Sequence, residues 1–114
     1  MAQAAISAAQ SGRMSGGVEA PGAEIPRDYN FAADILDRNL RAGRANKPVF
    51  IDRRGAWTYG QLAERVDRFG AVLRGKGLRR EERFMLCLLD TIDWPTAFLG
   101  AIKAGIVPVA VNTL

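Results

Sequence analysis

Asp90 and Asp93 are the two carboxylates whose spacing suggests chemistry in this sequence. Both follow an apolar stretch that we expect to be a strand, so they would lie at its carboxyl end. Two carboxylates placed there can share acid–base work or bind a hard cation. The same spacing suits a junction at which Asp90 ends the strand and Asp93 caps the following helix. We favour capping, so neither residue is assigned to catalysis or to a metal.

Gly70, Gly75 and Lys76 match the spacing of a phosphate-binding loop, in which glycine amides and a lysine surround the phosphates. Two features speak against this function. Gly77 stands where a hydroxyl residue should bind magnesium, and the segment ends a predicted helix instead of leading from a strand into one. We therefore interpret it as a glycine-rich helix terminus.

The sequence has no histidine and one cysteine, Cys87. An intrachain disulfide, a Cys/His zinc site and the Ser-His or Cys-His pairs of most nucleophilic hydrolases are therefore excluded. Cys87 lies in an apolar run without a neighbouring base, so we expect a small core residue. Trp57 and Trp94 are expected to be packing anchors at the ends of elements. No catalytic residue and no metal ligand is predicted.

The chain has 114 residues, of which 48% are hydrophobic and 25% charged, values typical of a single globular domain. Its net charge of +4 would favour nucleic acid only if the basic residues gathered on one face. They alternate with acidic residues instead, as in the run from Arg79 to Arg83. This pattern predicts solvated faces and no nucleic-acid partner.

The longest uncharged apolar tract, residues 104–111, is broken by Gly105 and Pro108 and is far shorter than the roughly 18 residues that span a bilayer. We therefore expect no membrane association. Residues 1–24 are rich in alanine, glycine and serine and lack the continuous apolar stretch of a secretory signal. They are interpreted as a flexible tail, with an organellar transit peptide as the alternative.

The elements that would position these residues alternate between strand and helix. Asn30 is a plausible cap for a helix that Gly43 stops, and Thr58 and Gln61 have the spacing of a capping box. Periodicity and turn residues predict, in order, a helix over 31–42, strands over 48–52 and 56–58, a helix over 59–75, a strand over 84–89, a helix over 94–104 and a strand over 106–111.

This order predicts an α/β fold, with a partial mixed or parallel sheet that carries helices on its faces. The unbroken apolar run of 84–89 is typical of a strand covered on both faces. The strand over 106–111 is followed only by Asn112–Leu114, so no later helix covers it. We therefore expect a fragment of a larger fold, whose isolated chain would aggregate or show dye-binding, molten behaviour.

Three stretches resemble the adenylate-forming enzymes of the acyl-CoA synthetase superfamily: residues 90–114, Trp57–Leu62, and Gly77-Leu78 before the first long strand. Asp28–Asp34, Arg38–Leu40 and Asp93–Pro95 look most like benzoate-CoA ligases and their aryl-CoA relatives. The resemblance covers nearly everything from residue 27 onward. It implies that residues 25–114 are the N-terminal portion of the AMP-binding large domain, incomplete as it stands.

The resemblance implies a cytoplasmic parent enzyme with a two-step reaction. A carboxylate such as benzoate attacks ATP to give an acyl-adenylate and diphosphate, and coenzyme A then displaces AMP to give benzoyl-CoA. ATP, Mg²⁺, coenzyme A and a small aromatic carboxylate are the implied cofactors and partners, and none is expected to bind this segment alone. The family's catalytic residues follow the point where this chain stops, so the segment alone is expected to be inactive.

Other members of the superfamily remain alternatives: a different acyl-CoA ligase or an adenylation domain that loads a carrier protein. A stand-alone scaffold domain without catalytic activity is the non-enzyme alternative. The oligomeric state is left open.

Asn112 and Thr113 are the one pair that the resemblance places near the chemistry. In parallel sheets, ligands gather beyond the carboxyl ends of the strands. These two residues would therefore lie at the rim of the crevice where nucleotide and coenzyme meet. A simple strand-ending turn is the alternative.

Overall fold

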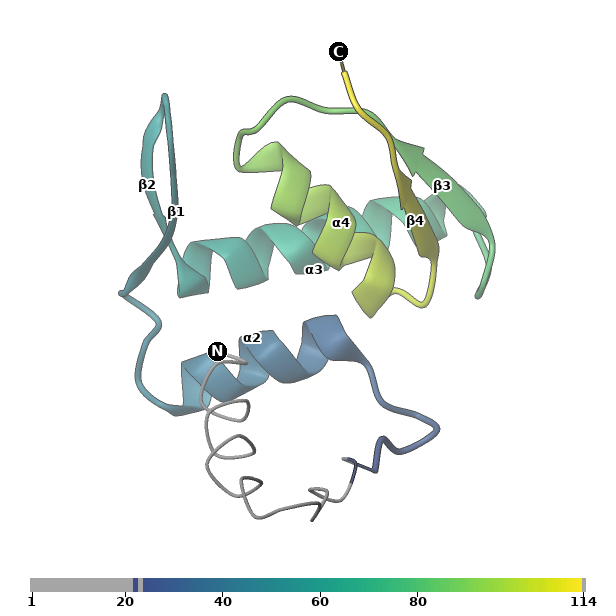
Figure 1. The fold of residues 1–114 in the computed structure, drawn as a ribbon, viewed down its shortest axis with the longest axis horizontal. Helices are drawn as coiled ribbons and strands as arrows, with labels where there is room; N and C mark the ends of the chain where they lie inside the picture. The colour runs from purple at the N-terminus through teal and green to yellow at the C-terminus, as the bar shows by residue number, and fades with distance from the viewer. Residues whose placement is uncertain (1–21, 23, 114) are drawn as a thin grey trace, which may run out of the picture.

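The computed structural model describes Gly22 and residues 24–113. The tail predicted for residues 1–24 therefore falls, apart from Gly22 and Glu24, outside the described residues. The elements in chain order are α2 (Phe31–Arg41), β1 (Pro48–Asp52), β2 (Gly55–Thr58), α3 (Tyr59–Gly75), β3 (Arg83–Leu86), α4 (Asp93–Lys103) and β4 (Val107–Ala110). Helices α2, α3 and α4 pack together, with the β1–β2 hairpin near the start of α3 and the β3–β4 pair near its end (Figure 1).

An apolar stripe along α3 forms the centre of the core. Leu62, Val66 and Leu73 are all buried. The first two pack with residues of α2 and of the turn before α4, whereas Leu73 packs with Ala101 and Ile106. A helix with one buried stripe can thus hold two clusters along its length, one beneath the hairpin and one beneath the β3–β4 pair.

Two glycines bring α3 and α4 close together. A Cβ built on Gly100 would lie 3.1 Å from the carbonyl oxygen of Val66 and 3.0 Å from a ring carbon of Phe69. A Cβ on Gly70 would lie 3.3 Å from the carbonyl oxygen of Gly100. Gly70, considered above as part of a phosphate-binding loop, therefore serves the packing of one helix against another.

The predicted helix ends are confirmed where local chemistry sets them. Thr58 and Gln61 form the capping box of α3, with both reciprocal hydrogen bonds present. The Asn30 side chain accepts from the Ala33 amide at 3.0 Å and also donates to the carbonyl of Ile102 at 2.8 Å, which ties α2 to α4. Gly105, at φ +83°, follows the C-cap of α4 in the left-handed conformation that glycine tolerates best.

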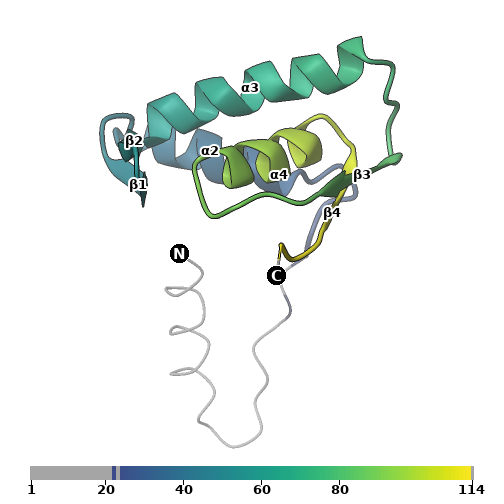
Figure 2. The same ribbon diagram turned by 90° about the horizontal axis from the view of Figure 1, so that it is seen from above.

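The strands form two separate pairs. β1 and β2 are antiparallel, whereas β3 and β4 are parallel, with Leu86 opposite Ala110. This confirms the mixed α/β class. The strand predicted over 84–89 is shorter, however, and its predicted burial on both faces is wrong for this chain: Met85 is 70% exposed and Leu89 68%. The helices lie on one side of the β3–β4 pair (Figure 2), and no helix of the described part of the chain covers its other face.

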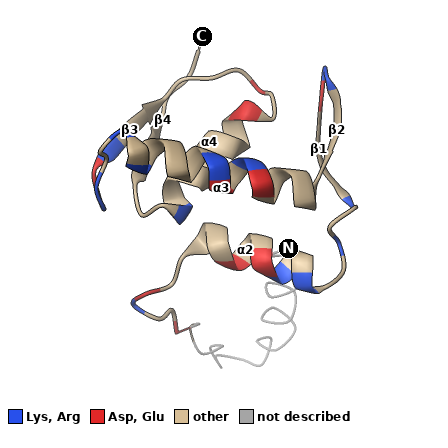
Figure 3. Cartoon of the chain, turned by 180° about the vertical axis from the view of Figure 1, so that it is seen from behind, with Lys and Arg blue, Asp and Glu red and all other residues tan. Residues whose placement is uncertain are grey.

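Basic and acidic residues are interspersed along the helices, as predicted (Figure 3). Arg38 pairs with Asp34, and Arg68 pairs with Glu64, each one helical turn apart. Among the described residues, no helix has the length and hydropathy needed to cross a bilayer.

Candidate functional site

Asn112 and Thr113 follow the carboxyl end of β4, which ends at Ala110, and both are exposed. The Val111 amide donates to the carbonyl of Leu86 at 2.9 Å, and this bond closes the β3–β4 ladder. Beyond it, the Cys87 thiol lies 3.8 Å from the carbonyl oxygen of Asn112. Cys87 and Asn112 are therefore side by side at the carboxyl edge of the strand pair.

Cys87 is exposed, so its prediction as a core residue is wrong. The reason is the early end of β3 at Leu86, which leaves Cys87 in the loop that leads to α4. We call residues 87–91 the edge loop. Leu88, Leu89 and Asp90 of this loop are also exposed, and no element among the described residues packs over them.

Asp93 does not cap α4, so that prediction is wrong as well. The cap position is Ile92, which has helical torsion angles and no side-chain hydrogen bond of its own to the helix. Asp93 is the first residue of the helix, and its carboxylate pairs with Arg65 of α3 at 2.5 Å and with Arg54 of the hairpin turn at 3.3 Å. A carboxylate in the first turn also suits the positive end of the helix dipole. Two arginines from other elements therefore determine its position.

The Ile92 amide, at the start of α4, instead donates a hydrogen bond to a residue of the hairpin. Asp52, the last residue of β1, accepts this hydrogen bond at 2.9 Å through one carboxylate oxygen. Its other oxygen accepts from the Arg54 amide at 2.8 Å and from the indole N–H of Trp57 at 3.1 Å. These donors, the Ile92 amide foremost, hold the pKa of Asp52 below its ordinary value of 3.8.

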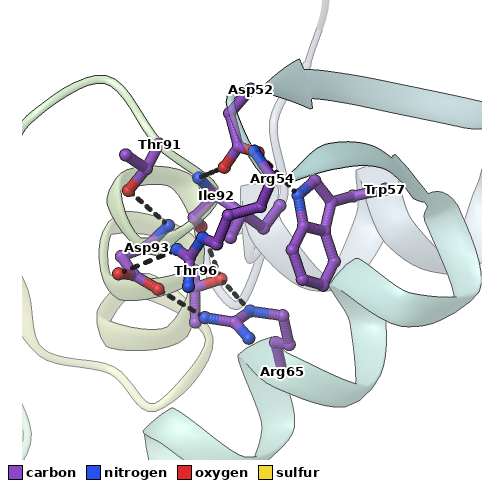
Figure 4. Close-up of polar contacts among 8 residues, drawn as sticks. All are labelled: Asp52, Arg54, Trp57, Arg65, Thr91, Ile92, Asp93 and Thr96. Atoms are coloured by element: carbon purple, nitrogen blue, oxygen red, sulfur yellow. Dashed lines mark hydrogen bonds and ion pairs between the residues drawn. The ribbon is translucent and has the colours of Figure 1, made fainter.

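Arg65 completes the contact between α3 and α4. It donates to the hydroxyl of Thr96 at 3.0 Å, and this hydroxyl donates in turn to the carbonyl of Ile92 at 2.7 Å. Its guanidinium also lies 5.2 Å from the ring centre of Trp57, within the range of a cation–π interaction. Figure 4 shows these side chains converging from the hairpin, α3 and α4. We call the set the hairpin–α4 network; its members are Asp52, Arg54, Trp57, Arg65, Thr91, Ile92, Asp93 and Thr96.

Sequence reasoning missed most of this network, because the bonds that join its separate elements, such as those of Arg65 and the one between Asp52 and Ile92, connect residues 28 to 40 positions apart in the chain. Only Trp57, expected as a packing anchor, hinted at it. Its charged groups are already paired, so the network holds elements together and supplies no free nucleophile or base.

Residues Gly70–Gly77 do not fit a nucleotide. The amide of Lys76 donates to the carbonyl of Val72 at 3.0 Å and that of Gly77 to Arg74 at 2.9 Å, so both amides are used in ending α3. This confirms the interpretation as a helix terminus. Among residues 24–113, no group of three or more Cys, Asp and Glu side chains could hold a metal ion. We therefore derive no catalytic step through ATP or Mg²⁺ from these residues.

Comparison with known proteins relates this architecture to one family. Residues 36–114 match the family described as AMP-binding enzyme. The benzoate–CoA ligase of Thauera aromatica is 54% identical over 95 residues, which cover 82% of this chain and 18% of that protein. The chain thus spans less than a fifth of the length of this relative.

Solved structures agree with this relationship. The benzoate CoA ligase from Burkholderia xenovorans LB400 superposes with a TM-score of 0.70 at 49% identity, covering 75% of this chain and 17% of that one. The anthranilate CoA ligase AuaEII, in complex with anthranoyl-AMP, superposes with a TM-score of 0.71 at 38% identity, covering 79% and 17%. On the sequence match and the shared fold, the chain belongs to the AMP-binding enzyme family.

Proposed function

We propose that residues 25–114 form the N-terminal portion of the large domain of an ATP-dependent aryl-CoA ligase. The complete enzyme would convert benzoate or a close analogue, with ATP and coenzyme A, into the aryl-CoA thioester, AMP and diphosphate. The observation that supports this most directly is the 54% identity to a benzoate–CoA ligase over 82% of the chain. The superposition on a solved benzoate CoA ligase also supports it.

The proposed reaction passes through an acyl-adenylate. A structural relative holds such a compound, anthranoyl-AMP, which supports this intermediate for an aromatic acid. Mg²⁺ would assist by neutralising the phosphates, and its ligands would lie outside the residues described here. We further propose that the enzyme acts in the cytoplasm, in the degradation of aromatic acids.

Within this enzyme, the segment would act as scaffold and as one rim of the crevice. Asn112 and Thr113 are the proposed rim residues, since they follow the carboxyl end of a parallel strand. The hairpin–α4 network would hold the adjoining loop. The 114-residue chain by itself is expected to give no benzoyl-CoA.

A chimaeric ligase tests the proposal. Residues 27–113 of this chain would replace the matching segment of the Thauera aromatica enzyme, and release of AMP would be followed with benzoate, Mg-ATP and coenzyme A. We expect a rate comparable to that of the parent enzyme, with benzoate preferred over a long-chain fatty acid.

Two controls make the result decisive. The parent enzyme without the segment should be inactive, and so should the 114-residue chain alone. A folded chimaera that shows no activity with benzoate would refute the proposal, as would turnover by the chain alone.

A further inference from the structure

The edge loop is anchored at both of its ends. At one end, the Leu86 carbonyl accepts the last hydrogen bond of the β3–β4 ladder. At the other, the Ile92 side chain is fully buried in the core cluster with Leu36, Leu62 and Val66. Because Cys87 contacts Asn112, the path of this loop determines the shape of the carboxyl edge of the sheet.

The second anchor depends on a residue from a different element. The cap residue of α4, Ile92, makes no side-chain hydrogen bond to the helix. Its amide donates instead to the carboxylate of Asp52, which lies 40 positions earlier in the chain. An amide buried with Ile92 would be costly to leave unpaired, and bonds to an ionised acceptor are among the stronger ones. Asp52 therefore fixes where α4 starts.

Asp52 is itself held rigidly enough to do this. The Arg54 amide and the Trp57 indole fix one of its oxygens, which leaves the other directed at Ile92 (Figure 4). Arg54 also reaches across to the carboxylate of Asp93. The tip of the hairpin and the first turn of α4 are thus joined by bonds in both directions.

We propose that Asp52 is a positioning residue for the edge loop. Acting through the Ile92 amide, it holds the loop that carries Cys87 against the rim residue Asn112. The expected effect on substrates rests on the proposed function. In that enzyme, a displaced loop would widen the crevice where ATP and coenzyme A meet. The positioning itself concerns only residues described here.

The first test uses the 114-residue chain and its single cysteine. In Asp52→Asn, the side chain loses its charge and keeps one acceptor oxygen for the three N–H donors that now bond two. We therefore expect the Ile92 amide to exchange with solvent about 10- to 100-fold faster. Alkylation of Cys87 by iodoacetamide should also be faster. The matched control is Asp67→Asn, which removes an exposed carboxylate of α3 that pairs with Lys103 of α4. It should change neither rate.

A second variant guards against a folding defect in Asp52→Asn. Trp57→Phe keeps an aromatic ring but removes the N–H that holds Asp52, so it should change both rates in the same direction by a smaller factor. Protection of the α2 amides from hydrogen exchange reports whether each variant is folded. Unchanged Ile92 exchange and Cys87 alkylation in a folded variant would overturn the inference, whatever the outcome of the activity assays.

The second test separates positioning from simple loss of folded enzyme. In the chimaeric ligase, a smaller folded fraction lowers the maximal rate and leaves every KM unchanged. A displaced edge loop instead raises KM for ATP or coenzyme A, and we expect about a tenfold rise in Asp52→Asn and none in Asp67→Asn. A lower maximal rate at unchanged KM values would contradict the inference. An inactive unmutated chimaera would refute the proposed function instead, and the exchange test would still decide the role of Asp52.

Discussion

The contrast between Asp52 and the other ion-paired residues shows what a single carboxylate can contribute. The pairs along one helix, such as Arg38 with Asp34, lie on the surface, and such pairs add little to stability because water screens them. Asp52 also contacts solvent, but it accepts hydrogen bonds from an indole and from the amide of a fully buried residue. The value of this carboxylate therefore lies in the donors that would lose their partner without it.

The lowered pKa of Asp52 makes this contribution depend on pH. A carboxyl group whose pKa is lower in the folded chain stabilises the fold above its unfolded pKa, near 4. That stabilisation is lost as the pH falls through the lower, folded pKa. We therefore expect wild type to exceed Asp52→Asn in urea midpoint, by a margin that is full above about pH 5 and shrinks below pH 4.

Urea unfolding followed by the helical circular dichroism signal, at several pH values from 6 to 2.5, would check this. Asp34 also has a lowered pKa, owing to the hydroxyl of Tyr29 and to Arg38, but it is present in both proteins and cancels in the difference. A margin that stays constant over the whole range would show that the Asp52 carboxylate does not stabilise the fold through its charge.

At the scale of elements, the contact between α3 and α4 depends on Gly100. An added methyl group there would press on the backbone of Val66 and on the ring of Phe69, at distances tighter than ordinary contacts. Because backbone cannot yield as a flexible side chain can, we expect Gly100→Ala to destabilise the chain by about 1–3 kcal/mol. The urea midpoint of the helical signal measures this.

Gly75→Ala is the matched control, since nothing lies within 4 Å of a Cβ at this last position of α3. Alanine should be neutral there or stabilising by up to about 1 kcal/mol, because it restricts the unfolded chain. Equal losses in the two variants would mean that the close approach of the helices does not determine the effect.

Elements whose ends are set locally were predictable from the sequence. The Thr58–Gln61 capping box and the Asn30 cap each depend on neighbours a few positions away, and both are confirmed. The left-handed Gly105 that follows α4 is set locally in the same way. The α/β class followed from the alternation of such elements, and family membership from the residues themselves.

What could not be predicted depends on partners far away in the chain. The end of β3 is set by where β4 stops pairing with it, so neither the shortened strand nor the exposure of Cys87 is visible in the apolar run itself. Asp93 has the sequence signature of a cap, yet Arg54 and Arg65 determine its role. Spacing along one segment gives no information about such contacts. The placement of Asn112 and Thr113 at a ligand crevice remains a prediction.

At the scale of the whole molecule, the open face of the β3–β4 pair is the dominant feature. Side chains alternate between the two faces of a strand, so Phe84 and Leu86 turn toward the helices while Met85 turns away. On β4, Val107 and Val109 share that outer face and are each about two-fifths exposed. The result is an apolar surface formed by neighbouring strands, which soluble monomers seldom leave uncovered.

We therefore expect the isolated chain to bind a hydrophobic dye and to self-associate through this face. The double variant Met85→Lys, Val109→Glu places opposite charges on directly paired positions, where they can attract each other, and should reduce both behaviours. Ile51→Lys is the control, because Ile51 is 80% exposed but lies on the hairpin. Dye fluorescence and sedimentation velocity measure the outcome. A wild-type chain that stays monomeric and binds no dye would show that this face is compatible with an independent domain, which favours the scaffold alternative over a part of a larger sheet.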